Sequence, residues 1–476
     1  MASVKRNFAF NVLLVISNIV FPVVIFPYIA RILGPQGLGN AHFALQFSKY
    51  FMITASLGIP IYGLREVAKV KDDVAKRSKL VSELLVLNFI TAILSTLVYF
   101  CVIYYSTNII EYKAYLIVAA IQVITGFLSI DWLFYGLEDF KTITIRSLVV
   151  RIVTIGFLIG FIQTPDDVMP YLVISILSIT AAHIWNLFYA FKQIQFQLFN
   201  LAILPHLKPI FIIFLMNVCI TMYTVFDTVW VGFLSSAAAV GLYTSAMKLC
   251  KISIPLVSAL GIVLQPKSAQ KFAANETQPA HLQTSFNFII DMAIPIAFGL
   301  CILAPEFLML LSGKAFLEAT LAMRILSILP LCIGLNNLFG MQILSASGHD
   351  KNLLFSVFCG MILHVILNIW LVPMYEHVGA AIAIASTEIF VTAITYLFVF
   401  IRFKITFSIS RVIRTVLISL GFIPIIEGLR YLHPDPALFL LLCIFVCFNY
   451  YLWIQWIAFK NEFIASGISV LKNKIS

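Results

Sequence analysis

The sequence predicts an all-α polytopic membrane protein, and three observations lead to that prediction. Of the 476 residues, 61% are hydrophobic and 11% are charged. The mean hydropathy of +1.01 is far above the range of soluble proteins. Apolar runs of about 18 residues or more recur along nearly the whole chain, and each is long enough to cross a bilayer as a helix. Their length and uninterrupted apolarity exclude a lipid-exposed β-barrel, whose strands are shorter and alternate in polarity.

Fourteen such runs follow one another, and we expect about 14 transmembrane helices. The fifth run is the shortest of them and the least clearly defined. In chain order the runs lie near 8–33, 40–64, 80–105, 114–135, 148–163, 170–191, 210–234, 242–264, 284–311, 320–346, 353–373, 379–401, 412–431 and 437–458.

The basic residues predict the orientation of these helices. A cytoplasmic N-terminus leaves only Lys113, Lys314 and Arg430 on the outer side, and most other Lys and Arg residues on cytoplasmic segments. We therefore expect both termini on the cytoplasmic side of a bacterial inner membrane. The net charge of +10 is then mostly a topology signal with contact to membrane lipid headgroups, and it does not indicate nucleic-acid binding.

The longest connections predict the division of the chain. The segments 192–209 and 265–283 are both cytoplasmic, and the first separates twelve runs into six and six. An even number of crossings per half gives both halves the same orientation, which allows a parallel pseudo-repeat with a site between two lobes. We expect an N-lobe at 1–191, a linker at 192–209, a C-lobe at 210–401, and two additional helices with a cytoplasmic tail at 402–476.

Two lysines lie well inside the eighth apolar run. At 100° per residue, Lys248 and Lys251 share a face about 80° wide with Thr244 and Ser258. Each Lys at a helix centre costs about 2.5–3.5 kcal/mol on insertion scales, unless it faces water, a counterion or a bundle interior. This cost favours a hydrated cavity. The alternative is that both side chains snorkel to the nearby outer surface.

If the chain is divided into two halves of six runs, the second run corresponds to the eighth. It places Lys49 at a similar depth on a polar face. Arg31 near the outer end of the first run and Arg324 near the outer end of the tenth could join it, although either could instead meet lipid headgroups. Several fixed positive charges with little negative charge nearby suit an anionic cargo such as a phosphate or pyrophosphate.

Acidic and amide residues form a second group in the later half of the chain. Asp227, Asn368 and Glu388 lie at outer-middle depth in the seventh, eleventh and twelfth runs. Their oxygen atoms could bind Na⁺ or take up protons as a coupling ion. The alternative is interhelical hydrogen bonding that fixes packing. His364, one turn before Asn368, is a further proton carrier on this hypothesis, or a structural residue.

The connections exclude an extramembrane catalytic domain, because most are short and none much exceeds about twenty residues. No H-E-x-x-H, Walker lysine loop or G-x-S-x-G motif occurs. We therefore predict that the protein is not an enzyme, and that it has no cofactor or structural metal.

Four stretches of the chain resemble the O-antigen and capsule repeat-unit flippases (Wzx type) of the MOP exporter superfamily. They are DWLFYGLEDFKTITIRSLVVRI at 131–152, the start NVLLVISNIVFPVVIFPYIARILGPQGLGNAHFA, the stretch ending GLREVAK, and LVPMYEHVGAAIAIASTEI at 372–389. The resemblance covers most of the chain. It implies a two-lobed transporter that moves an undecaprenyl-pyrophosphate-linked oligosaccharide to the periplasmic leaflet by alternating access, with polysaccharide polymerase machinery as a partner.

The resemblance also implies roles for individual residues. Basic side chains of the first, second and eighth spans line the central cavity in such flippases and in the related lipid II flippases, which points to Arg31, Lys49, Lys248 and Lys251. The related cation site uses spans seven, eleven and twelve, which points to Asp227 and Asn368. Glu388 departs from the pattern, because its position within its span is uncertain, and this leaves the ion open.

Two other classes of protein compete with the flippase. A multidrug or cation exporter of the same superfamily would be expected to place carboxylates in the first lobe's cavity, where spans one to three offer only Glu83 at a cytoplasmic edge. A membrane polymerase or glycosyltransferase would be expected to need a sizeable extramembrane loop. The identity of the sugars cannot be derived from the sequence.

Overall fold

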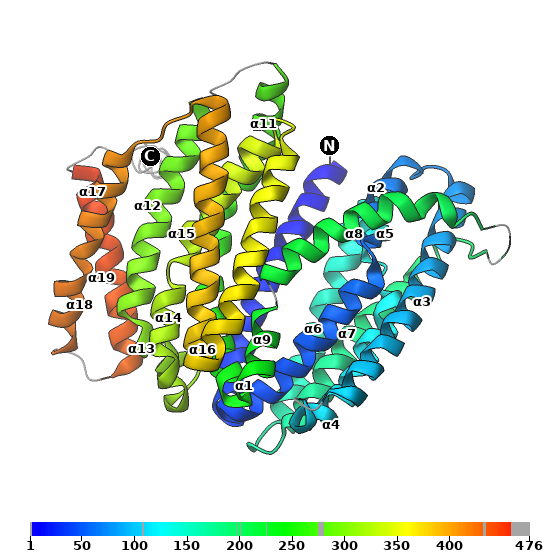
Figure 1. Ribbon diagram of the computed structural model, residues 1–476, viewed down its shortest axis with the longest axis horizontal. Coiled ribbons are helices and arrows are strands. Elements are labelled where there is room, and N and C mark those ends of the chain that lie inside the picture. The colour runs from blue at the N-terminus through cyan, green and yellow to red at the C-terminus, as the bar shows by residue number, and fades with distance from the viewer. Residues whose placement is uncertain are drawn as a thin grey trace. The chain divides into compact units, whose positions relative to one another are not determined.

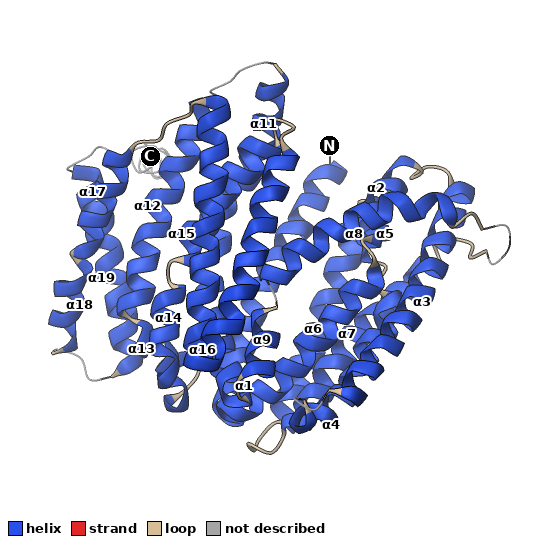
Figure 2. Cartoon of the chain, viewed as in Figure 1, coloured by secondary structure: helices blue, strands red, loops and turns tan. Residues whose placement is uncertain are grey.

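The protein is helical throughout the part of the chain that a computed structural model describes, which comprises residues 2–106, 109–197, 199, 201–224, 226–274, 280–431 and 435–457. No strand occurs among these residues (Figure 2). Eleven of the described helices are long and apolar enough, by length and composition, to cross a membrane. The predicted all-α polytopic fold is confirmed, whereas the number of fourteen crossings stays a prediction.

Two of the longest helices contain a sharp break that turns the chain. Gly34 in α1 has φ 66°, a left-handed value that glycine adopts without a steric penalty. Glu376 in α16 has φ 50° at the corresponding kind of break. Each helix is therefore two helical segments in one continuous stretch, and both breaks fall between apolar runs that the sequence predicts as separate spans.

The chain divides into two compact units, whose elements Figure 1 labels. The first unit contains the residues up to Thr244 together with His364–Ala380, and the second contains Ser245–Leu363 and the residues from Ala381 onward. The predicted N-lobe and C-lobe, with a linker at 192–209, stay a prediction. The predicted tail, residues 458–476, lies outside the described residues.

The first unit is built from nine helices among the described residues, together with parts of α10 and α16. They are α1 (Ala2–Ser56), α2 (Ile59–Lys69), α3 (Val74–Tyr105), α4 (Lys113–Ile124), α5 (Asp131–Gly136), α6 (Phe140–Phe161), α7 (Val168–Ala190), α8 (Leu204–Thr224) and α9 (Asp227–Leu234). Helix α1 packs against α3, α4, α6 and α7. It therefore forms the centre of this unit.

A close crossing joins the second segment of α1 to the start of α10 (Ala237–Lys251), within the first unit. A Cβ atom at Gly39 would lie 1.7 Å from the carbonyl oxygen of Ala237. A Cβ atom at Gly241 would lie 2.0 Å from the carbonyl oxygen of Pro35. Only glycine allows backbones to approach this closely. The glycines of the GPQGLG stretch thus supply both a turn and a helix crossing.

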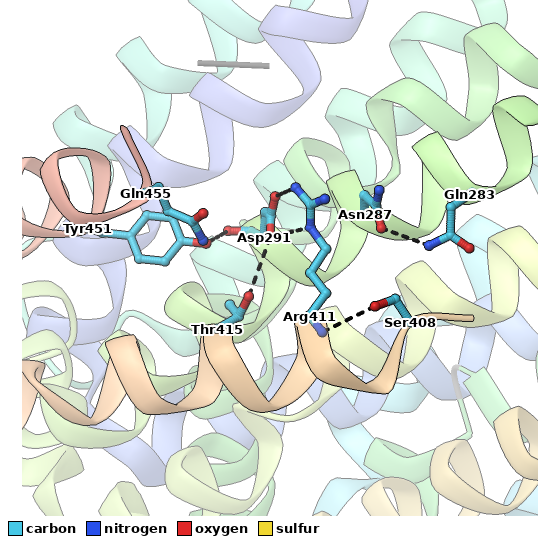
Figure 3. Close-up of polar contacts among 8 residues, drawn as sticks. All are labelled: Gln283, Asn287, Asp291, Ser408, Arg411, Thr415, Tyr451 and Gln455. Carbon is cyan, nitrogen blue, oxygen red and sulfur yellow. Dashed lines mark hydrogen bonds and ion pairs between the residues drawn. The ribbon is translucent and has the colours of Figure 1, made fainter. Parts of the chain in front are cut away.

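The second unit contains the remaining helices. They are α11 (Ile254–Ala273), α12 (Ala280–Ile302), α13 (Ala304–Leu311), α14 (Thr320–Leu326), α15 (Leu329–Asn336), a π-helical segment (Asn337–Ser345), most of α16 (Asp350–Phe403), α17 (Ile409–Leu420), α18 (Phe422–Arg430) and α19 (Pro436–Ile457). Helix α12 packs against α11, α15 and α17. A polar cluster around Asp291 of α12 and Arg411 of α17 lies at the last of these contacts (Figure 3).

Candidate functional site

A buried pair of side chains joins α9 to α16 within the first unit. Asp227 is the first residue of α9, and its Oδ1 lies 2.8 Å from Nε2 of His364, with side-chain exposures of 3% and 0%. This contact brings a carboxylate oxygen and an imidazole nitrogen within ion-pair distance of each other. His364 lies inside the candidate span Asp350–Phe403. The pair therefore places two ionisable side chains in contact at a buried position.

Asn368 lies one turn after His364 and completes this group. Its Nδ2 lies 3.0 Å from His364 Nε2 and donates to the main-chain oxygen of His364 at 2.9 Å. Its buried Oδ1 accepts no hydrogen bond from the described residues. A buried oxygen without a donor can accept a proton or ligate a cation. The structure thus brings Asp227 and Asn368 to the same imidazole, while their coupling role stays a prediction.

Glu388, the third predicted coupling residue, belongs to the second unit. It is 4% exposed, and its Oε2 accepts from Nδ2 of Asn336 at 2.8 Å. The π-helical segment begins at the next residue, Asn337. Such segments are rare and often occur at functional sites. Glu388 is therefore a buried carboxylate held by a neutral amide, in a unit different from that of Asp227 and Asn368.

Lys248 and Lys251 occupy the last turn of α10, and the helix does not continue through the predicted run 242–264. Helix α10 ends at Lys251, and α11 begins at Ile254 with Pro255 in its first turn. Proline has no N–H to continue the hydrogen-bond ladder. The ammonium groups therefore lie near the unsatisfied carbonyl groups of a helix C-terminus, where positive charge is favourable. The predicted single face extends only to Lys251, because Ser258 belongs to α11.

The other predicted cationic residues are distributed between the units. Arg31 is exposed and Lys49 is half-buried in the first unit, on either side of the break at Gly34. In the second unit Lys248 is half-buried, while Lys251 and Arg324 are exposed. Their gathering around one cavity stays a prediction.

Helix α6 carries polar residues that the sequence analysis did not assign. It begins at Phe140, well before the predicted run at 148–163, and Asp139 caps it by accepting from Thr142 N at 3.2 Å. The early turns of α6 contain Lys141 and Arg146, which lower the local hydropathy. The apolar run therefore begins later in the sequence than the helix does. The Asx cap was the signal that could have located it.

Two of the motifs that carry the family resemblance contact each other in the first unit. Gly63 lies so close to Trp132 that a Cβ atom would be 2.5 Å from its ring, and a Cβ atom at Gly136 would be 2.7 Å from the Val67 side chain. Asp131 Oδ1 accepts from Nη1 of Arg146 at 2.6 Å and from Asn186 Nδ2 at 2.7 Å. The GLREVAK and DWLFYG stretches therefore share a structural role, the packing of α2 against α5.

Glu83, the carboxylate weighed for an exporter, is engaged by the segment between α7 and α8 and by the first turn of α8. Its Oε1 accepts from Ala202 N at 2.8 Å, and its Oε2 lies 2.9 Å from Nε2 of His206. Ser78 and Ser82 accept from the main-chain N–H groups of Gln195 and Gln197, both at 2.9 Å. The polar start of α3 thus binds this segment, and Glu83 is 5% exposed.

The sequence pattern that defines the polysaccharide biosynthesis proteins matches residues 4–272, which is more than half of the chain. The chain belongs to this family. A second pattern, described as MatE, matches residues 213–370. These matches confirm the resemblance to Wzx-type flippases of the MOP superfamily.

Two proteins of known name resemble the chain over most of its length. A protein of Escherichia coli (strain K12) named "Putative O-antigen transporter" is 24% identical over 414 residues, which cover 83% of this chain and 97% of that protein. A protein of Shigella dysenteriae with the same name is 22% identical over 397 residues, which cover 81% of this chain and 98% of that protein.

Two solved structures share the fold of this polysaccharide biosynthesis family protein. "Lipid II flippase MurJ, inward closed conformation" matches with a TM-score of 0.77 and 16% identity, and covers 95% of this chain and 99% of that chain. A multidrug resistance MATE family transporter in an inward-facing conformation has a TM-score of 0.61 and 13% identity, over 81% of this chain and 94% of that chain. The protein is a multi-pass membrane protein with a MOP transporter fold, and its relatives are transporters, not enzymes.

Proposed function

We propose that the protein moves an undecaprenyl-pyrophosphate-linked oligosaccharide repeat unit from the cytoplasmic to the periplasmic leaflet of a bacterial inner membrane. The observation that carries this proposal is the alignment of more than four-fifths of the chain with two proteins named as O-antigen transporters. Both termini are cytoplasmic in this proposal, and polysaccharide polymerase machinery receives the product. The mechanism in this proposal is alternating access, which the division of the chain into two compact units supports.

The cationic residues support an anionic cargo. Arg31, Lys49, Lys248, Lys251 and Arg324 would meet the pyrophosphate and its neighbouring charges during the cycle. An ammonium or guanidinium group attracts phosphate oxygens strongly where water is scarce. Helix α10 ends at Lys251 and leaves its two lysines at a break in a span, where side chains can reach past the helix end.

An ion gradient would drive the cycle through Asp227, Asn368 and Glu388. The imidazole nitrogen of His364 beside the Asp227 carboxylate favours H⁺ as the ion, because Na⁺ prefers oxygen ligands. Entry of the ion would change the contact between α9 and α16 at these two side chains. That change couples the ion to the position of the helices, provided that the two conformations bind the ion with different affinity.

Export of a drug or another cation is the second candidate, since the fold is shared with a multidrug transporter. The contacts of Glu83 argue against export of a cationic drug. Both oxygen atoms of this carboxylate contact Ala202 N or His206 Nε2, and Glu83 is 5% exposed, so it is not open to a cationic ligand in this structure.

Complementation tests the proposal directly. Expression of the protein should restore outer-leaflet repeat units in a flippase-deficient strain that makes a matching lipid-linked glycan. A panel of such strains with different repeat units would identify the sugar. The proposal is wrong if the protein reaches the membrane in every strain and restores none, while a matched exporter assay shows efflux of cationic drugs.

A further inference from the structure

Arg151 holds a positive charge in the interior of α6, and the side chains that it contacts on α1 are neutral. Its Nη1 donates to Oγ of Ser17 at 2.5 Å, and its Nη2 donates to Oδ1 of Asn18. Its guanidinium carbon lies 5.7 Å from the centre of the Phe21 ring. Among the described residues, no carboxylate forms an ion pair with Arg151, so the charge is not neutralised.

The depth of Arg151 follows from the way α1 and α6 run side by side. Thr144 of α6 donates to the main-chain oxygen of Phe10 at 3.0 Å, and Tyr28 of α1 donates to the main-chain oxygen of Ile162 at 2.7 Å. The two segments are therefore parallel and in constant register. With a rise of 1.5 Å per residue, Arg151 lies about 10 Å from the first contact and about 16 Å from the second. It is deep within the candidate span Phe140–Phe161.

A second arginine on the same helix shows the difference that a counterion makes. Arg146 is 6% exposed and paired with Asp131 at 2.6 Å, which offsets its charge. Arg151 is half-buried, and its partner Asn18 is exposed. An arginine at the centre of a span costs at least about 2.5–3.5 kcal/mol on insertion scales. The cost of placing Arg151 at this depth is not offset by an ion pair with a described carboxylate, so we expect its charge to serve another function.

We propose that Arg151 binds the pyrophosphate of the lipid-linked cargo, and that Ser17 and Asn18 are positioning residues that orient its guanidinium. This inference rests on the proposed function. The planar guanidinium has five N–H donors, so two contacts with α1 leave donors for phosphate oxygens. Because the partners are neutral, the full positive charge remains to attract the anion. Bulk lipid headgroups lie at the membrane surface, whereas the pyrophosphate must pass this depth during transport.

Binding of undecaprenyl pyrophosphate to the purified protein tests the proposal without a transport assay. Thermal unfolding in neutral detergent would be followed over a concentration series of this lipid, with phosphatidylglycerol as a second probe. We expect Arg151→Gln to weaken the apparent affinity for undecaprenyl pyrophosphate by about tenfold or more, because charge-assisted contacts to phosphate are lost. Arg151→Lys should keep part of the affinity. Lys141→Gln, which removes an exposed charge from the first turn of α6, is the matched control and should bind normally.

The outcomes separate the two proposals. If the wild-type protein is stabilised by undecaprenyl pyrophosphate and Arg151→Gln binds it equally well, the role of Arg151 is wrong while the proposed cargo stands. A wild-type protein that does not respond to the lipid contradicts the proposed cargo itself. Equal stabilisation by phosphatidylglycerol, lost in Arg151→Gln, would show a general anionic lipid site and overturn the assignment to cargo.

A second variant keeps the test decisive if Arg151→Gln does not fold. The double variant Ser17→Ala, Asn18→Ala retains the charge but removes both groups that orient it. We expect a several-fold loss of affinity for undecaprenyl pyrophosphate with the unfolding temperature of the ligand-free protein little changed. Unchanged affinity in this variant would contradict the positioning role.

Discussion

The hydroxyl of Tyr451 donates to the main-chain oxygen of Asp291 at 2.8 Å, and this bond replaces one that Pro295 removes from α12. Proline has no N–H, so the carbonyl group four residues earlier loses its helical donor. The Asp291 carboxylate in turn accepts from Nε and Nη2 of Arg411 at 3.1 and 2.5 Å (Figure 3). Helices α17 and α19 thus bind α12 at its proline.

Removal of this hydroxyl should destabilise the second unit. In Tyr451→Phe the partly buried carbonyl group of Asp291 loses its donor, and we expect a loss of about 1–3 kcal/mol in the free energy of unfolding. Thermal or denaturant unfolding of the purified protein would measure it. Tyr431→Phe is the control, because Tyr431 is 91% exposed and its change should be nearly silent.

A double-mutant cycle with Pro295 tests the cause of this effect. Pro295→Ala returns an N–H that can donate to the carbonyl group of Asp291 within α12. Tyr451→Phe should therefore cost less in the Pro295→Ala background than in the wild type. Equal costs in both backgrounds would show that the hydroxyl acts through another contact.

Neutralisation of the buried carboxylates should uncouple transport from its ion gradient. We expect Asp227→Asn and Glu388→Gln to reach the membrane in normal amounts, and to lose the response of cargo flipping to a proton or Na⁺ gradient. Flipping in proteoliposomes with imposed gradients measures this dependence. Gradient-dependent flipping that persists in both variants would return these residues to a packing role.

The lysines at the end of α10 should matter through their charge. If Lys248 and Lys251 meet the pyrophosphate, Lys→Arg at each position keeps some transport, whereas Lys→Gln loses much more. If the lysines snorkel to the membrane surface, Lys→Gln should instead be nearly silent, because the uncharged amide removes an insertion cost. Restoration of outer-leaflet glycan at equal protein abundance distinguishes these cases. Full activity of the Lys248→Gln, Lys251→Gln double variant would exclude an anion-binding role.

The basic residues also predict a membrane orientation that can be measured. Reporter fusions at Lys79 and Lys271 should be cytoplasmic, and a fusion at Ser236 should be periplasmic. The opposite result at all three positions would reverse the orientation and, with it, the proposed direction of transport.

The apolar runs of the sequence were sufficient to predict an all-α membrane fold. The hydrocarbon core imposes length and apolarity on each span separately, so a local pattern reports them. The same pattern placed the start of α6 too late, because Lys141 and Arg146 lie in its early turns. It also treated residues 242–264 as one helix, although α10 ends at Lys251 and α11 begins at Ile254.

The sequence by itself determined which polar residues lie inside apolar spans, including Asp227, Asn368 and Lys248, because a polar residue stands out against apolar neighbours. Only the tertiary structure decided their partners. It placed His364 against Asp227, and Ser17 and Asn18 against Arg151. Helices that are apolar on nearly every side carry no periodic signal of their rotation or of the neighbour they face, so contacts between distant segments arise only when the whole bundle packs.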